Sequence, residues 1–205
     1  MIFGDPRTLA YRIVAILIAV TVHEFAHAWT ANRLGDPTPR MRGRLSLNPL
    51  VHLDLLGSLL LLTVGFGWAK PVEVNPRYFA NGRRGMLVVA AAGPVSNIVV
   101  MFIVGLLWKL GLAESSPVLA RLVFSIVSIN AVLAVFNMLP VPPLDGSRIL
   151  SGLLPPAQAL AYERVATYGP LLLLVLLILP ADIIGSFMRP SVTWLAAQAL
   201  GIGRP

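Results

Sequence analysis

A series of long apolar segments, separated by short polar or proline-rich loops, constrains this chain more than any other feature. Three of them, at about residues 9–30, 86–110 and 117–139, are long enough to cross a hydrocarbon core of about 30 Å as helices. Only 12% of the 205 residues are charged, whereas a soluble domain carries about 25%. The sequence therefore predicts an all-α integral membrane protein, with residues 1–205 forming a single domain.

The other apolar segments are shorter or interrupted. The run at about 53–66 has only 14 residues, so we expect a re-entrant or interfacial piece. Alternating valines and polar residues between prolines at 67–76 predict a short extended segment. The run at about 169–187 is expected to be a fourth span, although Pro180 and Asp182 interrupt it. We expect an interfacial helix at about 191–200.

Charge and cysteine content exclude several classes of function. The formal net charge is +7 and the chain has no cysteine. The basic residues lie in short loops between apolar runs, which is typical of membrane topology signals, so we do not expect nucleic acid as a partner. Disulfides, thiolate metal sites and cysteine nucleophiles are excluded.

The first apolar run contains the sequence His23-Glu24-Phe25-Ala26-His27. Residues four apart share one face of a helix, so both imidazoles can reach the same metal ion. A carboxylate beside them can take a proton from metal-activated water. The pair might instead be ordinary helix-face histidines, but ionisable groups inside a membrane helix are costly without a function. We therefore interpret the motif as a zinc site with Glu24 as general base.

A catalytic zinc usually has three protein ligands and one open position. Asp145 is the favoured third ligand, because it follows an apolar span and lies in a turn bounded by prolines. An aspartate before a glycine is also common as a simple turn residue, so this choice stays open. The full set of candidates is His52, Asp54, Glu73, Asp145 and Asp182.

Three motifs together resemble the site-2 protease family of intramembrane zinc metalloproteases. They are the H-E-x-x-H at His23, the Gly93-Pro94-x-x-Asn97 segment, and Asn137-x-x-Pro140-x-x-Pro143-Leu144-Asp145-Gly146. The resemblance implies zinc bound by His23, His27 and Asp145, with Glu24 as base. It also implies that Asn97 positions the substrate or stabilises the oxyanion, and that Asn137 acts similarly.

Further segments resemble the compact branch of that family, which has no PDZ or CBS domain. They are Asn48-Pro49-Leu50-Val51-His52 and Gly67-Trp68-Ala69-Lys70-Pro71. We interpret His52 as a structural or interface residue. The family resemblance implies cleavage of a peptide bond in or near a transmembrane helix of a protein substrate. A membrane metal transporter or metal sensor is the alternative, although Glu24 has no purpose in transport.

The shared metal ion also predicts the topology. The end of the first span and the segment after the third must lie at one membrane surface, so the weak run at 53–66 should not cross. Half of the sixteen basic residues then lie on one side, which the positive-inside rule makes cytoplasmic. They are Arg33, Arg40, Arg42, Arg44, Lys70, Arg77, Arg83 and Arg84. We expect a multi-pass protein of the cell membrane, with its active site toward the cytoplasmic face.

Overall fold

The computed structural model describes residues 6–63, 67–178 and 183–202, and their regular structure is helical. Short 3-10 turns lie between several of the helices, at Pro49–Val51 (η1), Pro76–Tyr78 (η2) and Leu112–Ser115 (η3). The α-helices in chain order are α1 (Pro6–Arg33), α2 (Thr38–Met41), α3 (Leu55–Thr63), α4 (Gly82–Lys109), α5 (Pro117–Asn137), α6 (Asp145–Leu153), α7 (Pro156–Ala166), α8 (Gly169–Ile178) and α9 (Ile183–Leu200).

Three helices, α1, α4 and α5, are long and apolar enough to cross a membrane. They match the three spans expected at 9–30, 86–110 and 117–139. Helix α4 begins four residues earlier than expected, because the side chain of Asn81 accepts a hydrogen bond from the backbone N–H of Arg84 and caps the helix. The loop-like residues after Asn81 are therefore its first turn.

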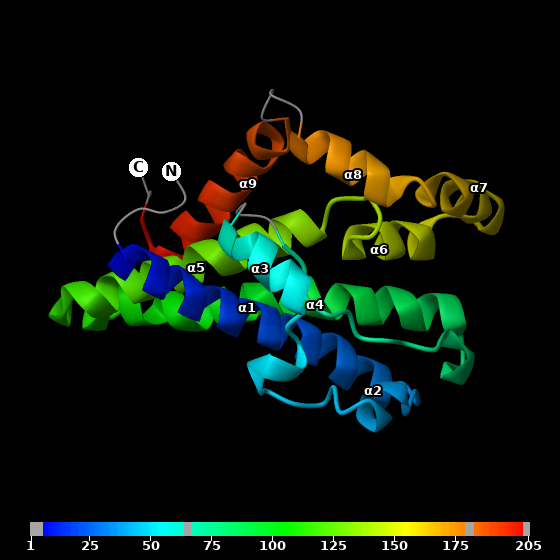
Figure 1. Ribbon diagram of the computed structural model, residues 1–205, viewed down its shortest axis with the longest axis horizontal. Coiled ribbons are helices and arrows are strands. Elements are labelled where there is room, and N and C mark those ends of the chain that lie inside the picture. The colour runs from blue at the N-terminus through cyan, green and yellow to red at the C-terminus, as the bar shows by residue number, and fades with distance from the viewer. Residues whose placement is uncertain (1–5, 64–66, 179–182, 203–205) are drawn as a thin grey trace.

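Helices α1, α4 and α5 pack against one another as the core of the structure (Figure 1). Asn97 of α4 donates hydrogen bonds to the carbonyl of Ala19 in α1 and to the side chain of Asn130 in α5. Further along, His27 of α1 bonds Val89, which precedes Asn97 in α4. Helices α1 and α4 are therefore antiparallel, and the end of α1 lies beside the start of α4.

The long connection between α1 and α4 returns to the end of the bundle where it began. The carboxylate of Asp36, directly after α1, accepts a 2.7 Å hydrogen bond from the backbone N–H of Asn75. Helix α3 lies within this connection, and its nine residues rise only about 13 Å, too little to cross a bilayer. The expectation that the run at 53–66 does not cross agrees with this arrangement, although residues 64–66 lie outside the described part.

A buried arginine holds this connection in shape. Arg44 is only 5% exposed, and its guanidinium donates hydrogen bonds to the backbone carbonyls of Val51, Lys70 and Pro71. Nearby, an isolated antiparallel bridge joins Leu53 and Ala69. The short extended segment expected at 67–76 therefore forms no strand among the described residues, because its polar backbone is bonded mainly to Arg44.

The C-terminal part differs from the expectation. The predicted span at 169–187 is described as two helices, α8 and α9, on either side of residues 179–182, which lie outside the described part. Figure 1 shows α9 returning from α8 toward α5. The helix expected in the membrane interface at 191–200 is the second half of α9, and its Ala199 and Leu200 are buried with Met101 and Val127.

Small residues explain why α9 packs instead of lying along the interface. A side chain added at Gly105 of α4 would meet the carbonyl oxygen of Ala199 at 2.5 Å. Backbones that approach this closely are typical of helix pairs inside a membrane. The interfacial helix was thus wrong, because exposed Trp194 suggested an anchor while the packing is determined by Gly105 and Ala199.

Labelling of single cysteines tests the fold in the membrane. Cysteines at Met41, Asn81 and Ser115, which are all exposed, are introduced one at a time into this cysteine-free chain. Met41 and Asn81 should react with an impermeant maleimide from the same side, and Ser115 from the other. Reaction of Met41 and Asn81 from opposite sides would contradict the returning connection. Pro39 is an unsuitable position because it is buried.

Candidate metal centre

The centre begins with two histidines one turn apart on α1. His23 and His27 are 5% and 8% exposed, and their rings lie edge to face with centroids 4.6 Å apart. Both rings rest on Gly93 of α4, where an added Cβ would lie 2.5 Å from Nε2 of His27 and 2.6 Å from Cε1 of His23. Only glycine leaves space for this pair.

Hydrogen bonds fix which nitrogen of each ring carries the proton. Nδ1 of His27 lies 2.7 Å from the carbonyl oxygen of Val89. A carbonyl only accepts, so this Nδ1 carries hydrogen, and Nε2 of the neutral ring presents a lone pair. An orienting bond of this kind is typical of histidines that bind metal.

A network of buried amides fixes the second ring in the same way. Asn97 is fully buried, and its Nδ2 donates to the carbonyl of Ala19 at 3.0 Å and to Oδ1 of Asn130 at 2.9 Å. Its Oδ1 therefore points at Nδ1 of His23, 2.7 Å away, and accepts a hydrogen bond from it. Nε2 of His23 is left with a lone pair as well.

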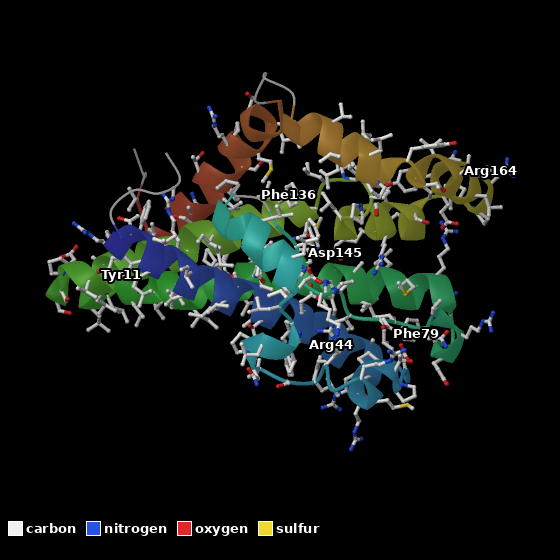
Figure 2. All side chains as sticks on the ribbon, viewed as in Figure 1. Tyr11, Arg44, Phe79, Phe136, Asp145 and Arg164 are labelled. Atoms are coloured by element: carbon white, nitrogen blue, oxygen red, sulfur yellow. The ribbon has the colours of Figure 1, made fainter. Side chains whose placement is uncertain are left out.

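The third group comes from the start of α6. The proline-rich turn after α5 places Asp145 so that its Oδ2 lies 3.0 Å from Nε2 of His23 and 3.2 Å from Nε2 of His27. The two Nε2 atoms are 3.0 Å apart. Because both protons reside on Nδ1, no hydrogen joins these three atoms, and Oδ2 of Asp145 is buried without a hydrogen-bond partner. Figure 2 places Asp145 where α4, α3 and α6 meet in view.

Three converging lone pairs repel one another unless a cation lies among them. Ligands at about 2.0–2.1 Å from a tetrahedral zinc are separated by about 3.3 Å, close to the separations of these three atoms. Burial acts to raise the pKa of the Asp145 carboxyl, but the two histidines outweigh burial and lower this pKa below its usual range. The ligand set of two neutral imidazoles and one carboxylate therefore fits zinc.

A cavity of about 450 Å³ opens onto the three groups. Glu24 lines it, is half-buried, and has no hydrogen bond or ion pair with any described residue. Asn137 lines it too, and its amide nitrogen donates to the carbonyl of Leu133. A carboxylate that is free, beside the metal ligands and in contact with a cavity is suited to accept a proton.

The structure separates the remaining ligand candidates from the centre. Fully buried His52 bonds the carbonyl of Ser46, in agreement with a structural role. Asp54 caps the backbone N–H of Gly57, and Glu73 pairs with Arg42 at 2.9 Å. Asp182 lies outside the described residues. Among described residues, His23, His27 and Asp145 are the group that can hold a metal.

Asn97 does not have the surroundings that a substrate-binding role requires. It is absent from the cavity lining and all its polar atoms are engaged within the protein, so its geometry supports a role in orienting His23. Sequence reasoning missed the carbonyl of Val89, which no side-chain pattern reveals. It also missed the function of Gly93, which was noted only as part of a motif.

Comparison with known proteins agrees with this site. The model of peptidase family M50 matches residues 109–179. YwhC of Bacillus subtilis, named as a candidate zinc metalloprotease, is 41% identical over 187 residues, covering 88% of this chain and 84% of YwhC. Rip2 of Mycolicibacterium smegmatis, named in the same way, is 32% identical over 85% of this chain and 71% of its own length.

A more distant relative is the regulator of sigma-E protease RseP of Escherichia coli. It is 29% identical over 62% of this chain and 31% of its own length, so the likeness covers only part of that longer protein. No solved structure matches the chain at a significant level.

Removing the partner of His23 should weaken metal binding. In Asn97→Ala, Nδ1 of His23 loses its acceptor, and zinc affinity should fall by about tenfold to a hundredfold. Competition with a chromophoric chelator measures this on the purified protein. Asn137→Ala is the control and should keep the parent affinity, since Asn137 has no bond to either histidine. An unchanged affinity in Asn97→Ala would refute the orienting role.

Filling the space beneath the two rings should have a larger effect. In Gly93→Ala the new methyl group would overlap both imidazoles, so they must move apart and zinc content should fall well below one per chain. Metal analysis by mass spectrometry gives the stoichiometry, and circular dichroism checks that helix content is kept. Gly111→Ala is not a suitable control, because Gly111 has a positive φ of 71°. Ala92→Ser on the same helix is used instead, and full zinc content in Gly93→Ala would contradict the packing.

Proposed function

Because this chain belongs to peptidase family M50, the site-2 protease family of zinc metalloproteases, we propose that it hydrolyses a peptide bond in or near a transmembrane helix of a protein substrate. The observation that supports this proposal most directly is a single cavity that combines the metal centre, a free carboxylate and apolar residues of two membrane helices.

In this proposal His23, His27 and Asp145 hold zinc. Zinc bound there polarises the scissile carbonyl and makes water acidic enough to be deprotonated near neutral pH. The carboxylate of Glu24 accepts the proton of the attacking water and then delivers it to the leaving amine. Asn97 and Val89 keep both imidazoles in the orientation that binds the metal. Asn137, which lines the cavity, is the amide placed to contact the substrate backbone.

The cavity indicates what kind of substrate fits. Ile16 and Val20 of α1, and Ile129 and Leu133 of α5, form an apolar wall that leads from the metal centre along both helices. Ile16 precedes His23 by two turns of α1, so the wall extends roughly 10 Å into the bundle. An apolar helix segment can be buried there, but its carbonyls must leave their helical bonds before attack. Helix-breaking residues in the substrate should therefore favour cleavage.

The charge distribution supports a location toward the cytoplasmic face of the cell membrane. The connection from the end of α1 to the start of α4 carries half of the chain's sixteen basic residues. The turn at the opposite end of the bundle, η3, contains the acidic residue Glu114 and no basic one. By the positive-inside rule the end that holds the metal centre is cytoplasmic. Metal transport is not retained as an alternative, because the relatives are named as metalloproteases.

The replacement Glu24→Gln tests the proposed reaction. It removes the proton acceptor but none of the metal ligands, so hydrolysis should fall by at least about a hundredfold while zinc content is unchanged. Quantitative proteomics of membranes from cells that express the parent or the variant identifies substrates, which should accumulate uncleaved in the variant.

The matched control is Glu114→Gln, in the exposed turn at the other end of the bundle. It should give the same proteome as the parent. Cleavage that continues in Glu24→Gln with zinc bound would refute the assigned role of Glu24. Identical membrane proteomes in the parent and Glu24→Gln would refute the proposed function.

A further inference from the structure

A second cavity, of about 780 Å³, lies beside the metal centre. Its walls are the first turns of α4, the helix α6, one face of α7 and the proline-rich turn that precedes Asp145. Pro143 and Arg148 line this cavity and also the one that contains the metal centre. A polypeptide lying across the metal centre can therefore continue into the second cavity past these two residues. Its volume is in the range of ordinary ligand sites.

Arg148 has a particular position at the junction of the two cavities. It lies three residues after Asp145 on α6, so the two side chains are on neighbouring parts of one helix face. Its side chain is exposed and has no hydrogen bond or ion pair with any described residue. The metal ligand and this guanidinium are thus presented to the same passing chain.

The other charged groups of the second cavity are already engaged. Nε and Nη2 of Arg83 donate to the carbonyl oxygen of Ser151 at 3.0 and 2.7 Å. Glu163 accepts a 2.7 Å hydrogen bond from the hydroxyl of Ser151. Two guanidinium groups therefore face one carboxylate in this lining, and Arg148 is the cation left without a partner among the described residues.

We propose that Arg148 and the second cavity form a subsite for an acidic residue of the substrate, located a few residues from the scissile bond. This inference rests on the proposed function and specifies the class of substrate. A glutamate or aspartate entering the cavity would form a bidentate pair with Arg148. A basic side chain there would meet two guanidinium groups, so the order of preference is acidic, then neutral, then basic.

Peptide binding tests this subsite without requiring hydrolysis. The full chain carrying Glu24→Gln is loaded with zinc and placed in phosphatidylcholine nanodiscs. The probes are fluorescent peptides with one apolar helix, a central Gly-Pro break and a six-residue polar flank with two Glu, two Gln or two Lys. One series has the flank at the N-terminal end and a second has it at the C-terminal end. In one series, the Glu peptide should bind about threefold to fivefold more tightly than the Gln peptide.

Substitutions then show whether Arg148 causes the preference. Adding Arg148→Gln should make the Glu and Gln peptides equal, and Arg148→Lys should keep part of the preference because the positive charge stays. Arg164→Gln is the matched control: Arg164 is an exposed arginine of α7 outside both cavities, and Figure 2 shows it at the far end from Asp145. This control should keep the full preference.

Crosslinking gives the position of the flank independently of charge. The photo-reactive residue p-benzoylphenylalanine is introduced at Leu160, which lines the second cavity, or at Val165, an exposed residue of α7 that does not. The Glu peptide should crosslink at Leu160 and not at Val165. Crosslinking equally at both positions, or at neither, would overturn the proposal.

The remaining outcomes also decide the question. Equal affinity for all peptides, no binding of any peptide, or a preference that survives Arg148→Gln would overturn the subsite. A preference that disappears when phosphatidylglycerol is added would mean that a lipid phosphate occupies Arg148, which overturns it as well. Failure here leaves the hydrolysis measured with Glu24→Gln unaffected, and absence of proteolysis there leaves this affinity ratio measurable.

Discussion

The arrangement of two imidazoles on Gly93, each held by a hydrogen bond from its Nδ1, determines the rest of this structure. The bonds to Asn97 and to the carbonyl of Val89 both come from α4, so α1 and α4 have one register relative to each other. They also leave two lone pairs and the carboxylate of Asp145 facing one point. The same contacts that align the helices therefore create the charge requirement that a metal ion satisfies.

Burial makes this arrangement demanding. Polar groups among apolar helices are costly unless every one is bonded, and Asn97 uses all of its polar atoms on His23, Ala19 and Asn130. The network joins α1, α4 and α5 across the bundle. We infer that the three helices hold the ring of His23 with little freedom, while the cavity side of the centre, with Glu24 and Arg148, stays open to water and substrate.

Much of this could be predicted from the sequence, because the determining signals are local. Helix length and apolar composition identify α1, α4 and α5, and the spacing of His23 and His27 identifies the metal pair. The choice of Asp145 required the resemblance to a family, since a turn aspartate before glycine has several uses. Contacts between distant segments could not be read in this way: the packing of Ala199 on Gly105, the bond from Val89 and the second cavity depend on how helices meet.

The central claim is that two imidazoles and one carboxylate hold the zinc of this enzyme. X-ray absorption at the zinc edge of the purified full chain tests it most directly, because imidazole gives a distinct multiple-scattering pattern. The account predicts four light-atom ligands at about 2.0–2.1 Å, of which two are imidazoles and two are oxygens, from Asp145 and water. Since His52 is the only other histidine of the chain, a third imidazole would mean that His52 binds the metal. That result would contradict the account.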